Sequence, residues 1–282
     1  MSRGVVIAPS FTFDGRTLHF PGLVGIEPSN LKHYLLYWDK IEYPNNNIIH
    51  IGTNADEQFL INTGVLSRSN ISLQGFSGNI GYAYILAQSI AFQQRNEQEP
   101  GSWTIAQSSK HLFLPQTHST QEQTIEIELY KALPSPGDEV SLDDILTFKE
   151  KRRAELASFQ RLIDELYLEV IGSADIPRAK TVAMERLENA IKDLHTTANE
   201  SWASKLISGF RVELNIPSLA GQAFAGAGLA ATFGVSPELG AAIGAIGAAI
   251  KFVFASTPKT KGLPDNLKDY AYLNYVEREL KS

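Results

Sequence analysis

The sequence contains no cysteine among its 282 residues. Disulfide bonds, thiolate metal sites and a cysteine nucleophile are therefore excluded, and no redox argument for secretion exists. The sequence also has no excess of positive charge: it contains 25 lysines and arginines and 31 aspartates and glutamates, so the formal net charge is −6. This balance argues against charge-driven binding of nucleic acid, so nucleic acid is not an expected partner by default.

A leader-like hydrophobic run is absent as well. The apolar stretch that begins at Gly4 turns polar too soon to form the core of a signal peptide, which favours a cytoplasmic start. Apolar residues make up 43% of the chain and charged residues 20%, the profile of a globular protein with a substantial core. We expect a cytoplasmic protein, with membrane association only under particular conditions.

The N-terminal part, residues 1–136, mixes strand and helix patterns, which predicts an α/β or α+β module. Residues 4–9 and 47–51 are short apolar runs typical of strands. Helices are expected at residues 27–44, at residues 55–66 up to a closing Gly64, and at residues 80–94. Residues 124–133 alternate apolar and polar side chains, the pattern of a half-buried strand.

The pattern changes after the turn-rich residues 132–141, so a second, mainly helical module is expected at residues 141–282. Ser141 is placed to cap a helix that runs to Gly172, with acids in its first turn and one apolar stripe. A second amphipathic helix starts near Pro177. Together the two helices predict an antiparallel helical pair.

Residues 219–255 are rich in glycine and alanine and form a predicted hydrophobic hairpin. Gly234, Ser236 and Pro237 stop one helix and start the next. Each helix would span roughly 22 to 26 Å, which is short of the approximately 30 Å hydrocarbon core of a bilayer. Small residues recur at spacings that let helices approach closely; these helix-packing positions are Ala223, Ala227, Ala231, Gly240, Gly244 and Gly247.

This spacing indicates close helix contact but does not identify what surrounds the helices. One interpretation is a hairpin that inserts into a membrane or assembles with other copies after release. The other is a buried hairpin packed on the amphipathic helices of residues 145–194. Both stay open at this point.

Catalytic patterns are few. Asp39 and Glu42 lie three apart at the end of the helix expected at residues 27–44, where their carboxylates could share a face. Glu126 and Glu128 lie on the strand expected at residues 124–133 and suggest a metal-dependent nuclease, although their spacing to Lys131 departs from the usual acid-x-lysine pattern. A solvated helix end with Lys40 as the local counterion also explains Asp39 and Glu42.

Cofactor and metal motifs are not expected. Residues 226–231 fit a loose dinucleotide fingerprint, but no strand leads into them and no acid follows about 20 residues later. The six histidines show no spacing typical of metal ligands. The sequence therefore predicts neither a cofactor nor a metal site.

Two stretches, "LLYWDKIEYP" and "ILTFKEKRRAELASFQRLIDELYLEVI", together with the later small-residue hydrophobic segment, resemble a family of uncharacterised bacterial proteins. The resemblance covers most of the chain and carries no catalytic motif. It implies a bacterial cytoplasmic protein of accessory or antiviral defence type, and it implies no reaction.

We expect a non-enzymatic effector or interaction protein. Its first module would bind a partner or signal, and its sheltered hairpin would then insert into a membrane or drive self-assembly. One alternative is a soluble metal-dependent hydrolase or nuclease that uses Asp39, Glu42, Glu126 or Glu128. The other is a purely structural interaction module with a protein partner.

Overall fold

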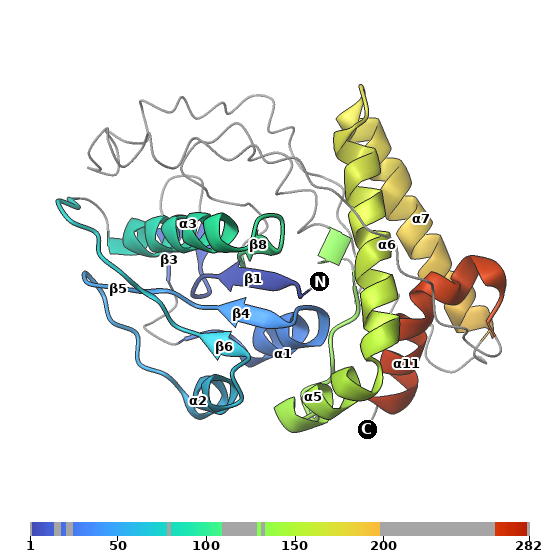
Figure 1. Cartoon of the computed structure of the whole chain (residues 1–282), viewed down its shortest axis with the longest axis horizontal. Coiled ribbons are helices and arrows are strands. Elements are labelled where there is room, and N and C mark those ends of the chain that lie inside the picture. The colour runs from blue at the N-terminus through green and yellow to red at the C-terminus, as the bar shows by residue number, and fades with distance from the viewer. Residues whose placement is uncertain are drawn as a thin grey trace. The chain divides into compact units, whose positions relative to one another are not determined.

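The computed structural model of the chain describes residues 2–13, 18–20, 25–77, 80–108, 129–130, 133–197 and 263–280 (Figure 1). The described residues up to 108 form one compact unit, and those from 129 onward form another. The first unit mixes helices and a sheet and the second is mostly helical, so the expected fold class is confirmed. The domain bounds 1–136 and 141–282 stay predictions.

A four-stranded parallel sheet forms the centre of the first unit. Its spatial order is β6-β4-β1-β8, and its strands are β1 (Gly4–Ile7), β4 (Lys40–Glu42), β6 (Leu66–Ser67) and β8 (Trp103–Ala106). All residues of β1 and β8 are buried, as expected for parallel strands covered on both faces. The strand predicted after Gly4 is therefore confirmed, whereas β8 was not predicted.

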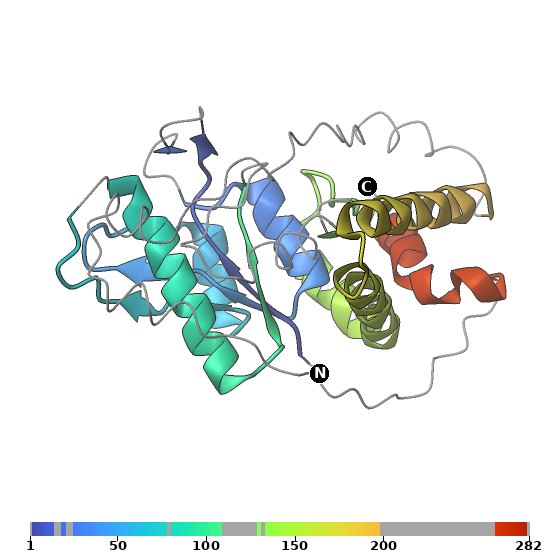
Figure 2. The same ribbon diagram turned by 90° about the horizontal axis from the view of Figure 1, so that it is seen from above.

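Among the described residues, three helices cover this sheet. They are α1 (Pro28–Tyr37), α2 (Ala55–Asn62) and α3 (Ile80–Gln98). Helices α1 and α2 lie on one face and α3 lies on the other (Figure 1, Figure 2). The chain passes outward from β1 to β4 and β6, then returns through α3 to β8 on the opposite side of β1. The order of strands thus reverses between β1 and β8, where ligands bind in many open α/β sheets.

Gln88 of α3 ties the two strands together at this reversal. Its side chain is fully buried, and Nε2 donates to the carbonyl oxygens of Val6 at 2.9 Å and of Ala106 at 2.7 Å. Its Oε1 accepts a hydrogen bond of 2.8 Å from Nε2 of Gln107. One amide therefore connects α3 to the carboxyl ends of β1 and β8.

The helix predicted over residues 27–44 is wrong in its second half. Helix α1 ends at Tyr37 because Trp38 adopts an extended backbone, with φ −114° and ψ 147°. The chain then enters β4, where Ile41 is fully buried and pairs with Val5. Pairing with the central strand has overridden the local helical pattern.

The strand predicted over residues 47–51 is also wrong. Strand β5 (Asn45–Asn46) is shorter and pairs in parallel with β7 (Asn70–Ile71). Oδ1 of Asn46 accepts from the backbone N–H groups of Ile48 and Ile49, at 2.9 and 2.8 Å. This side chain bonds the following backbone into a turn and thereby ends the strand. A further antiparallel pair joins β2 (Thr12–Phe13) to β3 (Leu18–His19).

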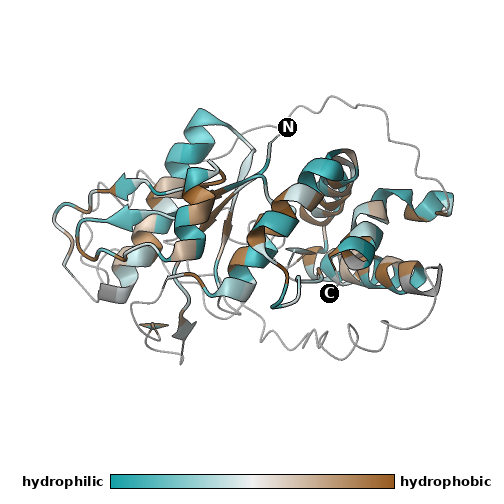
Figure 3. Ribbon diagram, turned by 90° about the horizontal axis from the view of Figure 1, so that it is seen from below, coloured by the Kyte–Doolittle hydropathy of each residue, from teal (hydrophilic) through white to brown (hydrophobic). Residues whose placement is uncertain are grey.

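The second unit is built from α5 (Leu142–Lys151), α6 (Arg153–Ile171), α7 (Ile176–Thr197), the 3₁₀ helix η2 (Asp265–Tyr270) and α11 (Ala271–Glu279). Ser141 and Asp144 cap α5 reciprocally, which confirms the predicted helix start. The single helix predicted up to Gly172 is instead interrupted at Arg152, whose backbone has φ −109° and ψ 26°. Each of these helices carries both hydrophobic and hydrophilic residues along its length (Figure 3).

Helix α11 contacts the chain at Arg152, where the predicted single helix is interrupted. The Arg152 guanidinium lies 3.6 Å from the centre of the Tyr275 ring and forms an ion pair with Glu279, which also binds Lys151 at 2.7 Å. Partial desolvation raises the pKa of the Glu279 carboxyl, but the hydrogen bonds from Arg152 and Lys151 outweigh it and leave that pKa lowered. Fully buried Tyr272 packs against Phe148 and Phe159 beside this ion pair.

Several predicted features lie outside the described residues. These include the hairpin 219–255 with its helix-packing positions Ala223, Ala227, Ala231, Gly240, Gly244 and Gly247. They also include residues 124–128 of the predicted alternating strand, although Leu129 and Tyr130, its described residues in regular structure, are helical and buried.

Replacing Gln88 by leucine should lower the stability of the first unit. The substitution removes both donors to the strand carbonyls and the acceptor for Gln107, so we expect a loss of about 2 to 4 kcal/mol. Urea denaturation followed by tryptophan fluorescence measures it, since Trp38 and Trp103 both belong to this unit. Gln94→Leu is the matched control because Gln94 is an exposed residue of the same helix. Equal losses in both variants would contradict the role assigned to Gln88.

Candidate functional site

Asp39 and Glu42 lie at opposite ends of β4. Asp39 precedes the strand, and its Oδ2 accepts a hydrogen bond of 2.8 Å from the backbone N–H of Arg3. Glu42 is the last residue of the strand. The expectation that the two carboxylates share a helix face is therefore wrong, because the residues do not belong to a helix and are separated along a strand.

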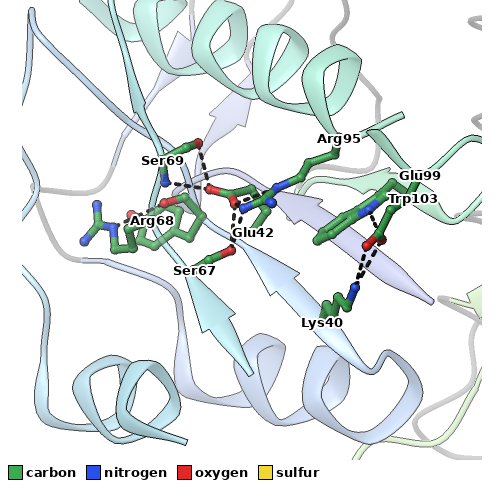
Figure 4. Close-up of polar contacts among 9 residues, drawn as sticks. Lys40, Glu42, Ser67, Arg68, Ser69, Arg95, Glu99 and Trp103 are labelled. Atoms are coloured by element: carbon green, nitrogen blue, oxygen red, sulfur yellow. Dashed lines mark hydrogen bonds and ion pairs between the residues drawn. The ribbon is translucent and has the colours of Figure 1, made fainter. Parts of the chain in front are cut away.

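Glu42 is fully buried and its carboxylate is surrounded by donors (Figure 4). Oε1 accepts from the backbone N–H and the hydroxyl of Ser69, both at 2.8 Å. Oε2 accepts from the hydroxyl of Ser67 at 2.7 Å and from Nε of Arg95 at 3.0 Å. Nη2 of Arg95 donates to the same Oε2 and also to the Ser67 hydroxyl, in the second case at 3.0 Å.

This arrangement leaves no free lone pair on Glu42. A carboxylate offers about four acceptor positions, and the bonds from Ser67, Ser69 and Arg95 fill them. We infer that Glu42 is a structural charge that joins β4, the end of β6 and α3. The other proposed catalytic acids, Glu126 and Glu128, lie outside the described residues.

Arg95 also packs on an aromatic ring. Its guanidinium lies 5.1 Å from the centre of the Trp103 ring, and the indole N–H donates to Glu99 at 3.0 Å. Glu99 forms an exposed ion pair with Lys40 at 2.8 Å, and the hydrogen bond from Lys40, followed by that from Trp103, lowers the pKa of the Glu99 carboxyl. A Cβ atom at Gly4 would lie 2.4 Å from the Trp103 ring, so glycine is required for this ring to lie against β1.

A second polar group of side chains lies just beyond the carboxyl ends of β4 and β6. Arg68 follows β6, and its guanidinium lies 4.3 Å from the centre of the Tyr43 ring. Nε of Arg68 donates to the carbonyl of Tyr43 at 3.2 Å, and Nη1 donates to the carbonyl of Gly52 at 3.5 Å. The Arg68 side chain is 12% exposed and the Tyr43 residue is fully buried.

Glu57, in the first turn of α2, is the charge partner of Arg68. Its Oε2 lies 3.7 Å from Nη1 of Arg68, and its side chain is fully buried. Oε1 accepts from the backbone N–H of Ile26 at 3.2 Å and from Nδ2 of Asn54 at 3.3 Å. A Cβ atom at Gly25 would lie 2.2 Å from Oε1, so the absence of a side chain at Gly25 lets this backbone reach the carboxylate.

Among the described residues, five buried polar atoms of this region have no hydrogen-bond partner: the hydroxyls of Tyr43 and Tyr84, Oε2 of Glu57, Oδ1 of Asn45 and Nδ2 of Asn46. The Glu57 contact with Arg68 is an ion pair beyond hydrogen-bond distance. We call Tyr43, Glu57, Arg68 and Tyr84 the edge cluster. Its members come from the ends of β4 and β6 and from α2 and α3, so both helical layers contribute side chains to the same edge of the sheet.

Electrostatics connect the four residues. Burial is the main cause that raises the pKa of the Tyr43 phenol; Glu57 and Tyr84 add to it, and Arg68 opposes it. Burial likewise raises the pKa of Tyr84 to about 12, again against an opposing effect of Arg68. Both phenols are therefore protonated at neutral pH and present O–H donors.

The sequence did not predict the edge cluster. The pairs that form it are separated by 11 to 41 residues, and no motif relates a helix-start acid to an arginine after a two-residue strand. The one available signal was the "EYP" at residues 42–44, where a strand end would have directed Glu42 and Tyr43 to opposite faces. Predicting a helix there concealed it.

Within the described ranges, no group of three or more histidine, aspartate or glutamate side chains is placed to hold a metal ion. Over the same ranges, none of the helices is sufficiently long and apolar to span a bilayer.

The strand order β6-β4-β1-β8, with helices on both faces, defines the first unit as an open parallel α/β fold whose strand order reverses beside β1. The chain belongs to the family of unknown function DUF6236, whose model matches residues 13–281. This match confirms the resemblance to an uncharacterised family. No curated protein and no solved structure matches the chain significantly.

Replacing Arg95 by leucine should destabilise the first unit by about 3 to 5 kcal/mol, because it leaves the buried Glu42 charge without its cationic partner. Urea denaturation measures the loss. The matched control is Lys40→Leu, which breaks an exposed ion pair on β4 and should leave the unfolding midpoint almost unchanged. An equally small effect in both variants would show that Glu42 is not a structural charge.

Proposed function

We propose that this protein is a non-enzymatic interaction protein whose α/β unit binds a small polar ligand at the edge cluster. Residues 219–255 then supply the response, by inserting into a membrane or by associating with other copies. A cytoplasmic location with conditional membrane association, and a role in bacterial defence, belong to this proposal.

The observation that carries the proposal is the set of three unpartnered atoms in the edge cluster. A buried polar group without a partner costs about 1 to 3 kcal/mol, and folded proteins hold few such groups. Three of them at one edge of a sheet suggest that a bound molecule completes their hydrogen bonds. Their position beyond the carboxyl ends of β4 and β6 is on the side of the sheet where open α/β folds bind ligands, one strand away from the reversal between β1 and β8.

The state of the two described candidate catalytic carboxylates, Asp39 and Glu42, favours binding over hydrolysis. The lone pairs of Glu42 are filled by Ser67, Ser69 and Arg95, and Asp39 holds the backbone of Arg3 at the other end of β4. A metal-dependent hydrolase would need carboxylate oxygens that are free to bind a cation. No observation among the described residues favours the hydrolase alternative.

The wild-type protein should retain a small molecule from an aqueous bacterial cell extract, and a Tyr43→Phe/Tyr84→Phe variant should retain it at least about tenfold less. Each lost hydroxyl removes a hydrogen bond worth about 1 kcal/mol. After incubation and washing, the protein is denatured and the released molecules are quantified by mass spectrometry.

The double variant is a clean probe because neither hydroxyl has a hydrogen-bond partner in the protein, so its removal should not weaken the fold. Tyr275→Phe is the matched control: it removes a hydroxyl from the other unit and keeps the ring that contacts Arg152. Retention that is absent in the wild type, or equal in all three proteins, contradicts ligand binding at this site.

The response is tested separately. In the presence of the retained molecule, the wild-type chain should float with phosphatidylethanolamine–phosphatidylglycerol vesicles or sediment as an oligomer. Gly244→Leu should reduce this association, because a large side chain on the glycine stripe keeps helices apart. Ala242→Leu, on the opposite side of the predicted helix, is the control. A wild type that neither floats nor self-associates would overturn the proposed response.

A further inference from the structure

The proposed function leaves the ligand undefined, and the edge cluster restricts its chemistry. We propose, on the basis of that function, that the cluster binds a free α-amino acid in its zwitterionic form. The carboxylate of the ligand would accept from Arg68 and the two phenols, and its ammonium group would donate to Oε2 of Glu57.

The charges of the cluster support a ligand of zero net charge. Arg68 and Glu57 are opposite charges 3.7 Å apart, with side chains that are 12% and 0% exposed. A purely anionic ligand would add a negative charge next to the buried Glu57 carboxylate, and a purely cationic ligand would add a positive charge next to Arg68. In both cases the cluster would carry a net charge in a place with little solvent. A zwitterion instead brings one charge to each partner.

The unused hydrogen-bonding groups match the same ligand. The two phenols are donors without partners, and among the described residues the Nη2 group of Arg68 makes no hydrogen bond. Of the two carboxylate oxygens of Glu57, Oε2 is the one that accepts no hydrogen bond, because Oε1 accepts from Ile26 and Asn54. Three donors and one acceptor in the cluster match in number the acceptor oxygens of a carboxylate and the donor of an ammonium group.

The aromatic rings argue against a stacked nucleobase. Arg68 covers one face of the Tyr43 ring at 4.3 Å, and the Tyr84 ring lies 5.2 Å from that of Phe20. The rings are therefore engaged within the protein, while their hydroxyls are not. Recognition through the hydroxyls, without stacking, suits a small ligand with oxygen acceptors.

Isothermal titration calorimetry of the full chain tests the proposal with individual free amino acids: glycine, L-leucine, L-phenylalanine, L-glutamine, L-glutamate and L-arginine. We expect at least one to bind. Blocking either charge of that amino acid, by N-acetylation or as the carboxamide, should weaken binding at least tenfold. Tyr43→Phe and Glu57→Gln should each raise its Kd about tenfold or more, whereas Glu99→Gln, in an exposed ion pair of the same unit, should not change it.

Two outcomes overturn the zwitterion proposal directly. One is equal affinity for the free and blocked forms, and the other is binding that Tyr43→Phe leaves unchanged; this variant also keeps the test valid if Glu57→Gln fails to fold. If no free amino acid binds but the extract yields a molecule whose retention depends on Tyr43 and Tyr84, the zwitterion fails and the proposed function stands. If the extract yields none either, both fail.

Discussion

The buried charge of Glu42 constrains the carboxyl edge of the sheet. A carboxylate without exposure must be paired and hydrogen-bonded, and its donors come from two other elements: Ser67 and Ser69 at the end of β6, and Arg95 of α3. These hydrogen bonds fix β6 against β4 and hold α3 over the face of the sheet on which the Glu42 side chain lies. One charge thus connects three segments that lie 25 to 53 residues apart.

The edge cluster follows from the same constraint. Side chains alternate between the two faces along a strand and its extension. Because Glu42, Ser67 and Ser69 turn toward one another, the intervening Arg68 and the adjacent Tyr43 are directed to the other side. There Arg68 packs on the Tyr43 ring and meets Glu57 of α2. The hydrogen-bonded network and the Tyr43, Arg68 and Glu57 side chains of the edge cluster therefore lie on opposite faces of one pair of strand ends, and α3 adds Tyr84 from the other layer.

Local signals predicted the elements that depend on local chemistry. The capped start of α5 at Ser141, the end of α2 ahead of Gly64, and the buried run of β1 are all set by neighbouring residues. Strand β4 escaped prediction because it is short and follows α1 directly, so its identity depends on pairing with Val5, some 36 residues away. The edge cluster escaped for the same reason, since every contact that defines it joins distant segments.

Two glutamates of this unit show how differently the fold treats a buried charge. Both are fully buried, yet Glu42 has both oxygens filled, whereas Glu57 has one oxygen held by Ile26 and Asn54 and the other without a hydrogen bond. The hydrogen bonds of Glu42 show that side chains at this edge of the sheet can fill every acceptor position of a buried carboxylate. The hydroxyls of Tyr43 and Tyr84, the other unpartnered groups of the edge cluster, likewise have no hydrogen-bond partner in the structure. The proposed ligand would complete the hydrogen bonds of these three groups together.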